Sequence, residues 1–278
     1  MKQSPNTIVF VPAGGLCNRM KAIASAVCLA RSCGARLQIK WFQDWGLGCK
    51  FADLFEPLPF ADVRLDEVST LDKLLYDRPR AKNLRLPALF QRLMFPVRMD
   101  EKATTAGLYA HLDFPKVVKG HDAWLAANVY FMSQDIPQDA FDAFRPVAAL
   151  RQKIRSRAAG WDERVIGVHI RRTDNRISIA ESPTQLFVER MRREPADTRF
   201  FLATDSEDVK KELLSCFGER VIFSPDKAER GTRKGMEEAL VELYLLSRCR
   251  LILGSSHSTY SLTAASIGHK TIEIMRRQ

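Results

Sequence analysis

The sequence lacks the features that mark several large classes of protein. No apolar stretch approaches the ~18 uninterrupted residues of a membrane-spanning helix. The first six residues, MKQSPN, lead into a short β-type run and not into a hydrophobic region of signal-peptide length. Nor is there an internal repeat or a low-complexity tract. We therefore expect neither a membrane span nor a signal peptide.

Cysteine motifs and the common nucleotide-binding fingerprints are also missing. None of the six cysteines forms a C-x-x-C pair, which excludes a zinc ribbon or a thioredoxin-like site. Six cysteines among 278 residues are too few for a disulfide scaffold, so we expect reduced thiols in a cytoplasmic protein. The chain has neither a G-x-G-x-x-G dinucleotide fingerprint nor the G-K-[ST] of a P-loop.

What is present is an ordinary globular composition with a basic excess. Hydrophobic residues make up 46% of the chain and charged residues 27%, which excludes wholesale disorder and fibrous repeats. Lys and Arg number 43 against 33 Asp and Glu, giving a formal charge of +10. That excess fits either a solvated cationic surface or an anionic partner, such as nucleic acid, anionic lipid or a phosphorylated small molecule.

The position of the basic residues narrows these alternatives. Residues 151–176 hold eight Lys/Arg against three acidic residues, and part of this cluster follows an expected strand. Small ligands bind at such strand ends. Aromatic residues do not interleave with the basic ones as a base-stacking platform requires. A nucleic-acid-binding protein is therefore only a minor alternative, and we expect no nucleic acid partner.

The C-terminal half alternates short apolar runs with helical patterns. We expect strands over 164–171, 199–203, 220–223, 250–253 and 271–275. We expect helices over 182–193, 206–217, 235–248 and 258–267, with Ser182 as the N-cap of the first and Gly268 just past the end of the last. Such alternation predicts an α/β fold with a mainly parallel five-stranded sheet covered by helices on both faces.

Polar turns follow four of these expected strands. Ligands of open parallel sheets bind beyond the carboxyl ends of the strands, so we expect the turns to line one crevice. The turns are Arg171-Arg172-Thr173-Asp174, Thr204-Asp205-Ser206, Ser224-Pro225-Asp226 and Gly254-Ser255-Ser256-His257-Ser258. Two arginines, several hydroxyls and helix N-termini together favour a phosphate-bearing ligand.

The N-terminal half begins with a βαβ unit. A strand over 7–12, a turn at Gly14-Gly15, a helix over 18–33 and a strand over 36–41 are expected. Residues 44–146 are less clear. The Pro- and Arg-rich stretch 76–98 fits either a surface excursion or a short basic amphipathic helix, and 116–119 fits a strand. We predict two domains, residues 1–146 and 147–278.

Three segments together resemble a known enzyme family. These are Gly14-Gly15-Leu16-Cys17-Asn18-Arg19, His169-Ile170-Arg171-Arg172-Thr173-Asp174, and the stretch from Glu242-Leu243-Tyr244 to Ser255-Ser256-His257-Ser258; the Ala203-Thr204-Asp205 turn matches as well. The sequence is similar in them to the fucosyltransferases that include the bacterial nodulation fucosyltransferase and the core α1,6-fucosyltransferases. The resemblance covers 160–278 well and 7–40 moderately, and it leaves the middle uncovered.

The resemblance implies an inverting, metal-independent glycosyltransferase with two Rossmann-like domains facing a cleft, the B-type architecture. It implies no cofactor, GDP-fucose as the donor, and a glycan or glycolipid acceptor. Arg171 would bind the diphosphate with support from Arg172, and His169 and Glu242 would lie at the guanine. The remaining donor-binding residues would be Gly14, Gly15, Asn18, Thr204, Asp205, Ser255, Ser256 and Ser258.

Each of these residues also has a structural alternative. His169 fits a buried core histidine, Glu242 fits a salt bridge to a neighbouring turn, and Asp205 fits a cap on the following helix. Strand alternation places Arg172 on the face opposite Arg171. The serines of the last turn fit simple helix capping.

The catalytic base and the linkage are the least determined parts of the resemblance. Asp174 and Glu181 are the local candidates for the base, and Asp174 fits equally a role in holding the arginines. Asn175 stands where the α1,6-specific enzymes carry Lys, and the loop up to Ser182 is one residue shorter, so the linkage does not follow. Cys17 replaces a glycine, and Glu242 stands where the family has Asp.

Two other functions remain open from the sequence. One is a glycosyltransferase or a non-catalytic binder that uses a different nucleotide sugar. The other is the nucleic-acid-binding protein already weighed. For the leading alternative, a bacterial-type fucosyltransferase, we expect a cytoplasmic location. The basic stretch 76–98 would add peripheral contact with the anionic inner membrane, at about 1 kcal/mol per basic residue.

Overall fold

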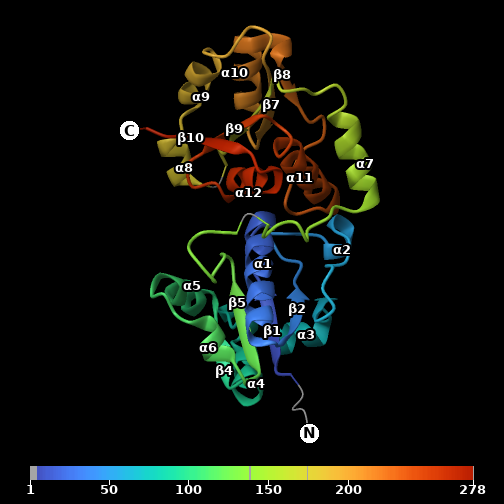
Figure 1. The fold of residues 1–278 in the computed structure, drawn as a ribbon, viewed down its shortest axis with the longest axis vertical. Coiled ribbons are helices and arrows are strands. Elements are labelled where there is room, and N and C mark those ends of the chain that lie inside the picture. The colour runs from blue at the N-terminus through green and yellow to red at the C-terminus, as the bar shows by residue number, and fades with distance from the viewer. Residues whose placement is uncertain (1–4, 138, 174, 278) are drawn as a thin grey trace. The chain divides into compact units, whose positions relative to one another are not determined.

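The computed structural model describes residues 5–137, 139–173 and 175–277. The chain divides into two compact units (Figure 1). The first contains Met1–Arg145 together with Arg230–Arg233, and the second contains Pro146–Glu229 and Lys234–Gln278. Each unit has its own parallel sheet, as the α/β prediction requires.

The first unit is built on five parallel strands in the order β3-β2-β1-β5-β4. The strands are β1 (Thr7–Pro12), β2 (Arg36–Trp41), β3 (Val63–Glu67), β4 (Val97–Met99) and β5 (Ala123–Ala127). The helices are α1 (Leu16–Cys33), α2 (Phe51–Leu54), α3 (Thr70–Tyr76), α4 (Leu86–Met94), α5 (Glu101–Tyr109) and α6 (Phe114–Val118), with a 3₁₀ turn η1 at Ala81–Asn83. The segment 116–119, which the sequence suggested as a strand, forms the end of helix α6 and its C-cap Lys119, so that prediction was wrong. The Asp113 carboxylate caps the helix, and Pro115 stands in its first turn.

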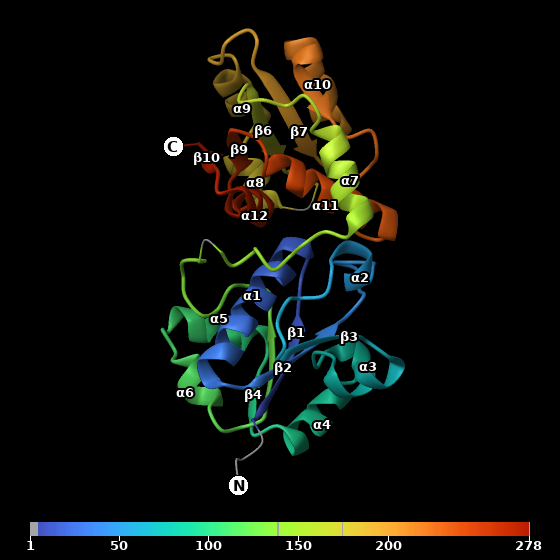
Figure 2. The same ribbon diagram turned by 45° about the vertical axis from the view of Figure 1, so that its right-hand side comes forward.

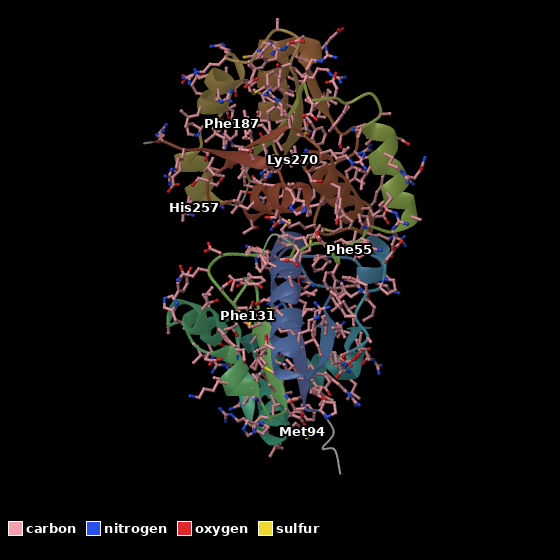
Figure 3. The ribbon with its side chains drawn as sticks, in the orientation of Figure 1. Phe55, Met94, Phe131, Phe187, His257 and Lys270 are labelled. Carbon is pink, nitrogen blue, oxygen red and sulfur yellow. The ribbon has the colours of Figure 1, made fainter. Side chains whose placement is uncertain are left out.

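Alternate residues of β1 bury themselves on opposite faces of this sheet. Val9 and Val11 belong to a cluster that includes Trp124 and, from the α3–α4 side, Tyr76 and Phe90. On the other face the Phe10 ring packs near Phe131 (labelled in Figure 3), which in turn packs against Phe114 of α6. The sheet is thus covered on both faces, which explains why β1 and β5 are almost entirely apolar.

The second unit repeats the plan with the order β10-β9-β6-β7-β8, again all parallel. The strands are β6 (Val165–Ile170), β7 (Arg199–Thr204), β8 (Val221–Phe223), β9 (Leu251–Ser255) and β10 (Thr271–Met275). The helices are α7 (Ala148–Arg157), α8 (Arg176–Glu181), α9 (Thr184–Met191), α10 (Glu207–Phe217), α11 (Arg233–Leu246) and α12 (Thr259–Gly268), with a 3₁₀ turn η2 at Gly218–Arg220. The predicted five-stranded parallel sheet is confirmed.

Two faces of the second sheet are covered by different helices. Ile166, Val168 and Ile170 of β6 pack into a core with α9 and α10, including Phe187. On the opposite face, a Cβ at Gly167 would lie 2.9 Å from Leu246 Cδ2 of α11, so that helix approaches the strand closely. Because side chains alternate along a strand, His169 faces the α11–α12 side.

Several predicted helix ends differ in the structure; α11, for example, spans Arg233–Leu246 and not 235–248. Pro183, and not Ser182, is the N-cap of α9, because the short helix α8 precedes it and ends with Ser182. Gly268 is the last residue of α12, and the left-handed residue past the end is His269, at φ +50°. The helix after the glycine turn begins at Leu16 and not at Asn18.

Two further observations concern the described residues as a whole. None of their helices combines the length and the apolarity that crossing a bilayer demands. No disulfide joins their cysteines.

Candidate functional site

The candidate site lies at the carboxyl edge of the second sheet. The end of β6 pairs with the end of β7, Ile170 beside Thr204, and with β9, His169 beside Gly254. The residues that follow these three strands therefore meet at one edge. The structure thus brings together the predicted turns at 171–173, 204–206 and 255–258.

Asp205 organises the turn that follows β6. Its carboxylate accepts hydrogen bonds from the backbone N–H of Arg172 (2.8 Å) and from the Thr173 hydroxyl (2.6 Å), and it lies 3.2 Å from Nη1 of Arg171. Burial disfavours the charged carboxylate, but these partners outweigh burial and hold the pKa of Asp205 below its usual range. The helix-cap alternative for Asp205 is wrong, because the Ser206 hydroxyl caps α10.

Arg171 retains access to solvent at this edge. Its side chain is 21% exposed, and its backbone N–H donates to the hydroxyl of Ser255 at 3.1 Å. Asp205 thus helps to place the guanidinium, while part of the Arg171 side chain remains exposed. A forked, permanently charged donor of this kind suits a phosphate group.

The neighbouring Arg172 has a different environment. Its guanidinium donates to the backbone carbonyls of Arg171 (2.7 Å) and Ser182 (2.8 Å) and to the hydroxyl of Thr184 (2.9 Å). Burial lowers its pKa. Through these contacts Arg172 connects the turn after β6 to the start of α9. Its predicted support of the diphosphate stays a prediction.

His169 is a buried, hydrogen-bonded imidazole. Its Nδ1 lies 2.7 Å from the Ser261 hydroxyl and 3.3 Å from that of Ser258, and its ring packs on Tyr260 with centroids 4.8 Å apart. Burial, aided by the nearby Arg171 charge, lowers the pKa of His169 to about 3. The ring is therefore neutral at physiological pH.

The predicted residues Ser255, Ser256 and Thr204 donate hydrogen bonds to β6 and to α8. Ser255 donates to the His169 carbonyl (3.1 Å), and Thr204 donates to the Ile170 carbonyl (2.7 Å). Ser256 donates to the Glu181 carboxylate at 2.6 Å. Ser258 is the N-cap of α12 but makes no side-chain capping bond. These hydroxyls fix the shape of the turn.

Glu181 ends α8 beside the serine turn and meets a histidine that the sequence reasoning did not single out. Its Oε2 lies 3.2 Å from Nε2 of His257, a residue in the left-handed region at φ +52° (His257 is labelled in Figure 3). The Ser256 hydroxyl and then His257 hold the pKa of Glu181 below its usual value. The sequence did contain a signal for His257, because this histidine stands among the polar residues of a turn that follows a predicted strand. Asp174, the other candidate base, lies outside the described residues.

The C-terminal strand braces this segment. The backbone N–H of Arg277 donates to the Glu181 carbonyl at 2.8 Å. The Ser182 hydroxyl donates to the Met275 carbonyl and accepts from the Ser256 N–H at 2.8 Å. Ser182 is fully buried and thus ties β10, α8 and the serine turn together, in place of its predicted capping role.

Glu242 belongs to a second buried cluster, at the end of β8. It lies on α11 with the Ser224 hydroxyl as a hydrogen-bond partner, and burial followed by repulsion from Glu238 raises its pKa to about 8. Fully buried Glu238 is itself bound by Lys153 (2.7 Å) and Arg157. Sequence reasoning missed Glu238, although it precedes Glu242 by one helical turn.

The basic cluster predicted at 151–176 is largely used inside the unit. Lys153 and Arg157 bind Glu238 and Asp226, and Arg164 binds Asp162. Much of the local positive charge is therefore neutralised by the fold, while Arg171 lies at the strand edge and stays partly exposed.

The glycine turn belongs to the first unit. Gly14 adopts φ +80°, and Gly15 is the N-cap of α1. The fully buried Arg19 donates from Nε to the Gly14 carbonyl (2.8 Å) and from Nη2 to Asp44 (2.8 Å), and burial lowers its pKa to about 10. Asn18 stands on the first turn of α1, and its buried Oδ1 has no hydrogen-bond partner among the described residues.

Metal-ligating side chains do not gather in the part of the chain that the structure describes. No group of three or more His, Cys, Asp or Glu residues there could hold a metal ion.

Comparison with known proteins identifies the fold. No protein-family model matches the sequence, and a search of curated protein sequences returned no match. Among solved structures, the chain is similar to NodZ α-1,6-fucosyltransferase co-crystallised with GDP, with a TM-score of 0.67, 19% identity, and coverage of 94% of this chain and 92% of that one. Fucosyltransferase NodZ from Bradyrhizobium gives 0.66, 20%, 94% and 93%. POFUT1 in its apo form gives 0.63, 11%, 99% and 99%. The chain thus shares the fold of these fucosyltransferases, which confirms the predicted resemblance at the level of fold.

Proposed function

We propose that this protein is a fucosyltransferase that takes fucose from GDP-fucose and transfers it to a glycan or glycolipid acceptor, with inversion and without a metal ion. The observation that carries the proposal is Arg171, which Asp205 contacts at the carboxyl edge of β6 and whose side chain is partly exposed. Shared fold adds support, since NodZ has been solved after soaking with GDP-fucose and POFUT1 in complex with GDP-fucose.

The charge development of the reaction explains the need for Arg171. As the bond from the fucose anomeric carbon to the diphosphate breaks, negative charge grows on the leaving oxygen while the sugar becomes oxocarbenium-like. A fixed cation in a dry site stabilises that charge, and removal of one such donor typically costs about 2.7–4 kcal/mol of barrier. Arg171 is held in place by Asp205 before the donor arrives, which reduces the reorganisation that the reaction requires.

Glu242 suits recognition of the guanine. A carboxylate can accept from the N1–H and the 2-amino group of that base together, a pairing that uracil cannot offer. Glu242 is buried, and a hydrogen bond with the Ser224 hydroxyl favours its charged form. Two donors from guanine would stabilise its charged form and replace the solvation that burial removes.

The acceptor hydroxyl must lose a proton as it attacks the anomeric carbon opposite the diphosphate. Glu181 is ionised at neutral pH, because Ser256 and His257 lower its pKa, so it can receive that proton. We retain Glu181 and Asp174 as the two candidate bases. The proton then resides on the carboxylate, and GDP leaves with the electron pair of the broken bond.

Donor selectivity provides the test. The protein should gain thermal stability with GDP and GDP-fucose, more than with GDP-mannose and far more than with a UDP-sugar. GDP-fucose incubated with the protein and a panel of glycans should yield fucosylated product by mass spectrometry. Stabilisation by a UDP-sugar alone would replace this proposal with the other nucleotide-sugar alternative, and tight GDP-fucose binding without transfer would indicate a non-catalytic binder.

A further inference from the structure

Helix α4 of the first unit exposes its leucines to solvent. Leu86, Leu89 and Leu93 recur at spacings of three and four residues, which places them on one face, and Leu89 and Leu93 are 64% and 85% exposed. Met94 extends the same end of the helix (labelled in Figure 3). The adjoining α3 adds exposed Leu71 and Leu74, and α3 packs against α4 (Figure 2). We call these residues, with Leu84, the leucine face.

The opposite side of α4 is the one that binds the unit, and it does so partly with polar groups. Buried Gln91 donates from Nε2 to the carbonyls of Leu75 (3.2 Å) and Asp77 (2.9 Å). Phe90 packs edge-on to Tyr76 at 5.6 Å between centroids. These contacts fix the orientation of α4, so its leucines cannot rotate into the core of the first unit without breaking them. A helix with glutamine inside and leucines outside reverses the usual pattern of a soluble surface helix.

Unpaired positive charge surrounds the leucine face. Residues 81–98 contain Lys82, Arg85, Arg92 and Arg98 and no acidic residue. All four side chains are exposed, and none makes an ion pair with a residue that the structure describes. Two acids that precede α4 in the chain are already bound: Asp72 by Lys40 at 2.8 Å, and Asp77 by Arg80 at 2.7 Å.

The backbone before α4 holds an unfavourable conformation that displays this face. Leu84 and Arg85 both lie in the left-handed region, at φ +49° and +54°. Two consecutive non-glycine residues there are uncommon, and side chains other than glycine adopt it at a cost. The result is that Leu84 is 80% exposed at the start of α4, beside a free guanidinium.

We propose that the leucine face is a docking surface for an anionic lipid bilayer. Leucines on one side with Lys and Arg around them form the composition of helices that lie in the membrane interface, with the apolar side chains among the acyl chains and the cations at the headgroups. The positive charge around the leucines favours a bilayer over other partners, because cations without neighbouring acids complement the extended negative surface of anionic lipid headgroups. The proposal concerns the first unit alone and does not depend on the donor.

Vesicle co-sedimentation tests the proposal. The full-length protein should bind vesicles of phosphatidylcholine with phosphatidylglycerol and bind pure phosphatidylcholine weakly, and salt should weaken the anionic binding. Leu89→Glu with Leu93→Glu should lower the partition coefficient by at least about tenfold. Arg92→Gln should lower it by about fivefold.

Matched controls lie on the second unit. Leu214→Glu changes a partly exposed leucine of α10, and Arg193→Gln changes an exposed arginine after α9; both should bind vesicles as the parent protein does. GDP affinity should be unchanged in the double-leucine variant, which separates this result from the proposed function. Equal binding by the double variant overturns the proposal. So does a dimer, detected by sedimentation velocity, that the leucine changes dissociate, because the face would then join two copies.

Discussion

At the scale of single residues, two adjacent arginines have separate tasks. Arg171 lies beside the Asp205 carboxylate with a partly exposed side chain, whereas Arg172 binds two carbonyls and a hydroxyl. The alternation of side chains along a strand predicted that they would diverge. The sequence could not show which of the two arginines would be bound by other residues of the protein, because two partners of Arg172 lie 10 and 12 positions further along the chain.

Arg171→Ala should reduce fucose transfer by about 10²–10³-fold, because a positioned donor to the leaving diphosphate is lost. Isothermal titration should show weakened GDP binding, and circular dichroism should show an intact fold. Arg171→Lys should recover only part of the activity, since an ammonium cannot bind two oxygens in a fork.

Arg193→Ala is the control for Arg171, since Arg193 is exposed beyond α9 and should be neutral. Arg172→Ala should instead lower the free energy of unfolding by about 1–3 kcal/mol, because it leaves buried carbonyls without a donor. A folded Arg171→Ala protein with parental transfer rates would contradict the assignment of the diphosphate site.

Glu242 should make GDP binding depend on pH. Its carboxyl has a pKa of about 8 and is faced by Glu238, Arg157, Lys210 and Ser224. If guanine binds the ionised form, GDP affinity falls as pH drops below about 8, by up to about tenfold per pH unit. Glu242→Gln should weaken GDP binding and abolish this slope. Titrations at several pH values measure both effects, and an unchanged slope in the variant would assign the titration to another group.

Glu242 should also lower the free energy of unfolding. The pKa of Glu242 lies at about 8 in the folded protein against 4.5 ordinarily, so the unfolded chain loses its proton first as pH rises. Stability contributed by this group is therefore present below about pH 4.5 and is lost on the way to about pH 8. Glu242→Gln should raise the free energy of unfolding by about 1–3 kcal/mol near neutral pH, measured by urea denaturation. No gain over the parent protein would show that the buried carboxyl is better compensated than its surroundings suggest.

At the scale of elements, the sequence predicted best those strands and helices that have a regular hydrophobic pattern and polar turns at both ends. The strands β1, β2 and β10 occupy the predicted residues, because each is an apolar or alternating run between polar turns. Segments that depend on neighbours were missed. Helix α8 is six residues long, and its C-cap Ser182 has partners on β10 and in the turn 255–258. No local pattern carries that information.

The glycine turn before α1 offers an element-level test with an internal control. Gly14 and Gly34 both have positive φ, but a Cβ at Gly14 would lie 3.0 Å from Asn18 Nδ2, while at Gly34 it would meet nothing within 4 Å. Gly34→Ala should cost about 1 kcal/mol of stability from backbone conformation alone. Gly14→Ala should cost measurably more in urea denaturation and should shift Asn18. Equal losses would mean that Asn18 yields freely.

At the scale of the whole molecule, the composition indicated a basic protein. It could not show which cationic side chains are bound to groups of the protein and which are exposed to solvent. Arg19, Lys153, Arg157 and Arg172 are engaged inside their units, whereas the cations around α4 are not. The α/β class and the edge of the second sheet followed from strand–helix alternation. The segment Arg230–Arg233, which belongs with the first unit, interrupts the second in a way that alternation does not reveal.

Hydrogen exchange across the whole chain should locate the donor site. GDP should slow amide exchange in the turns 171–173 and 255–258 and around Glu242 of α11, because bound ligand suppresses local opening. Residues 81–98 should exchange as before, and they serve as the internal reference. Protection limited to the α3–α4 region would place the nucleotide away from the second sheet and would contradict the proposed function.

The brace formed by the last strand has a practical consequence for anyone who engineers this chain. Arg277 and Met275 hold the segment of Glu181 and Ser182 through their own backbone groups, so these contacts tolerate side-chain replacement at 275 and 277 but not loss of those residues. Trimming the final few residues should therefore impair turnover without touching any group that meets the sugar, and purification tags belong at the opposite terminus.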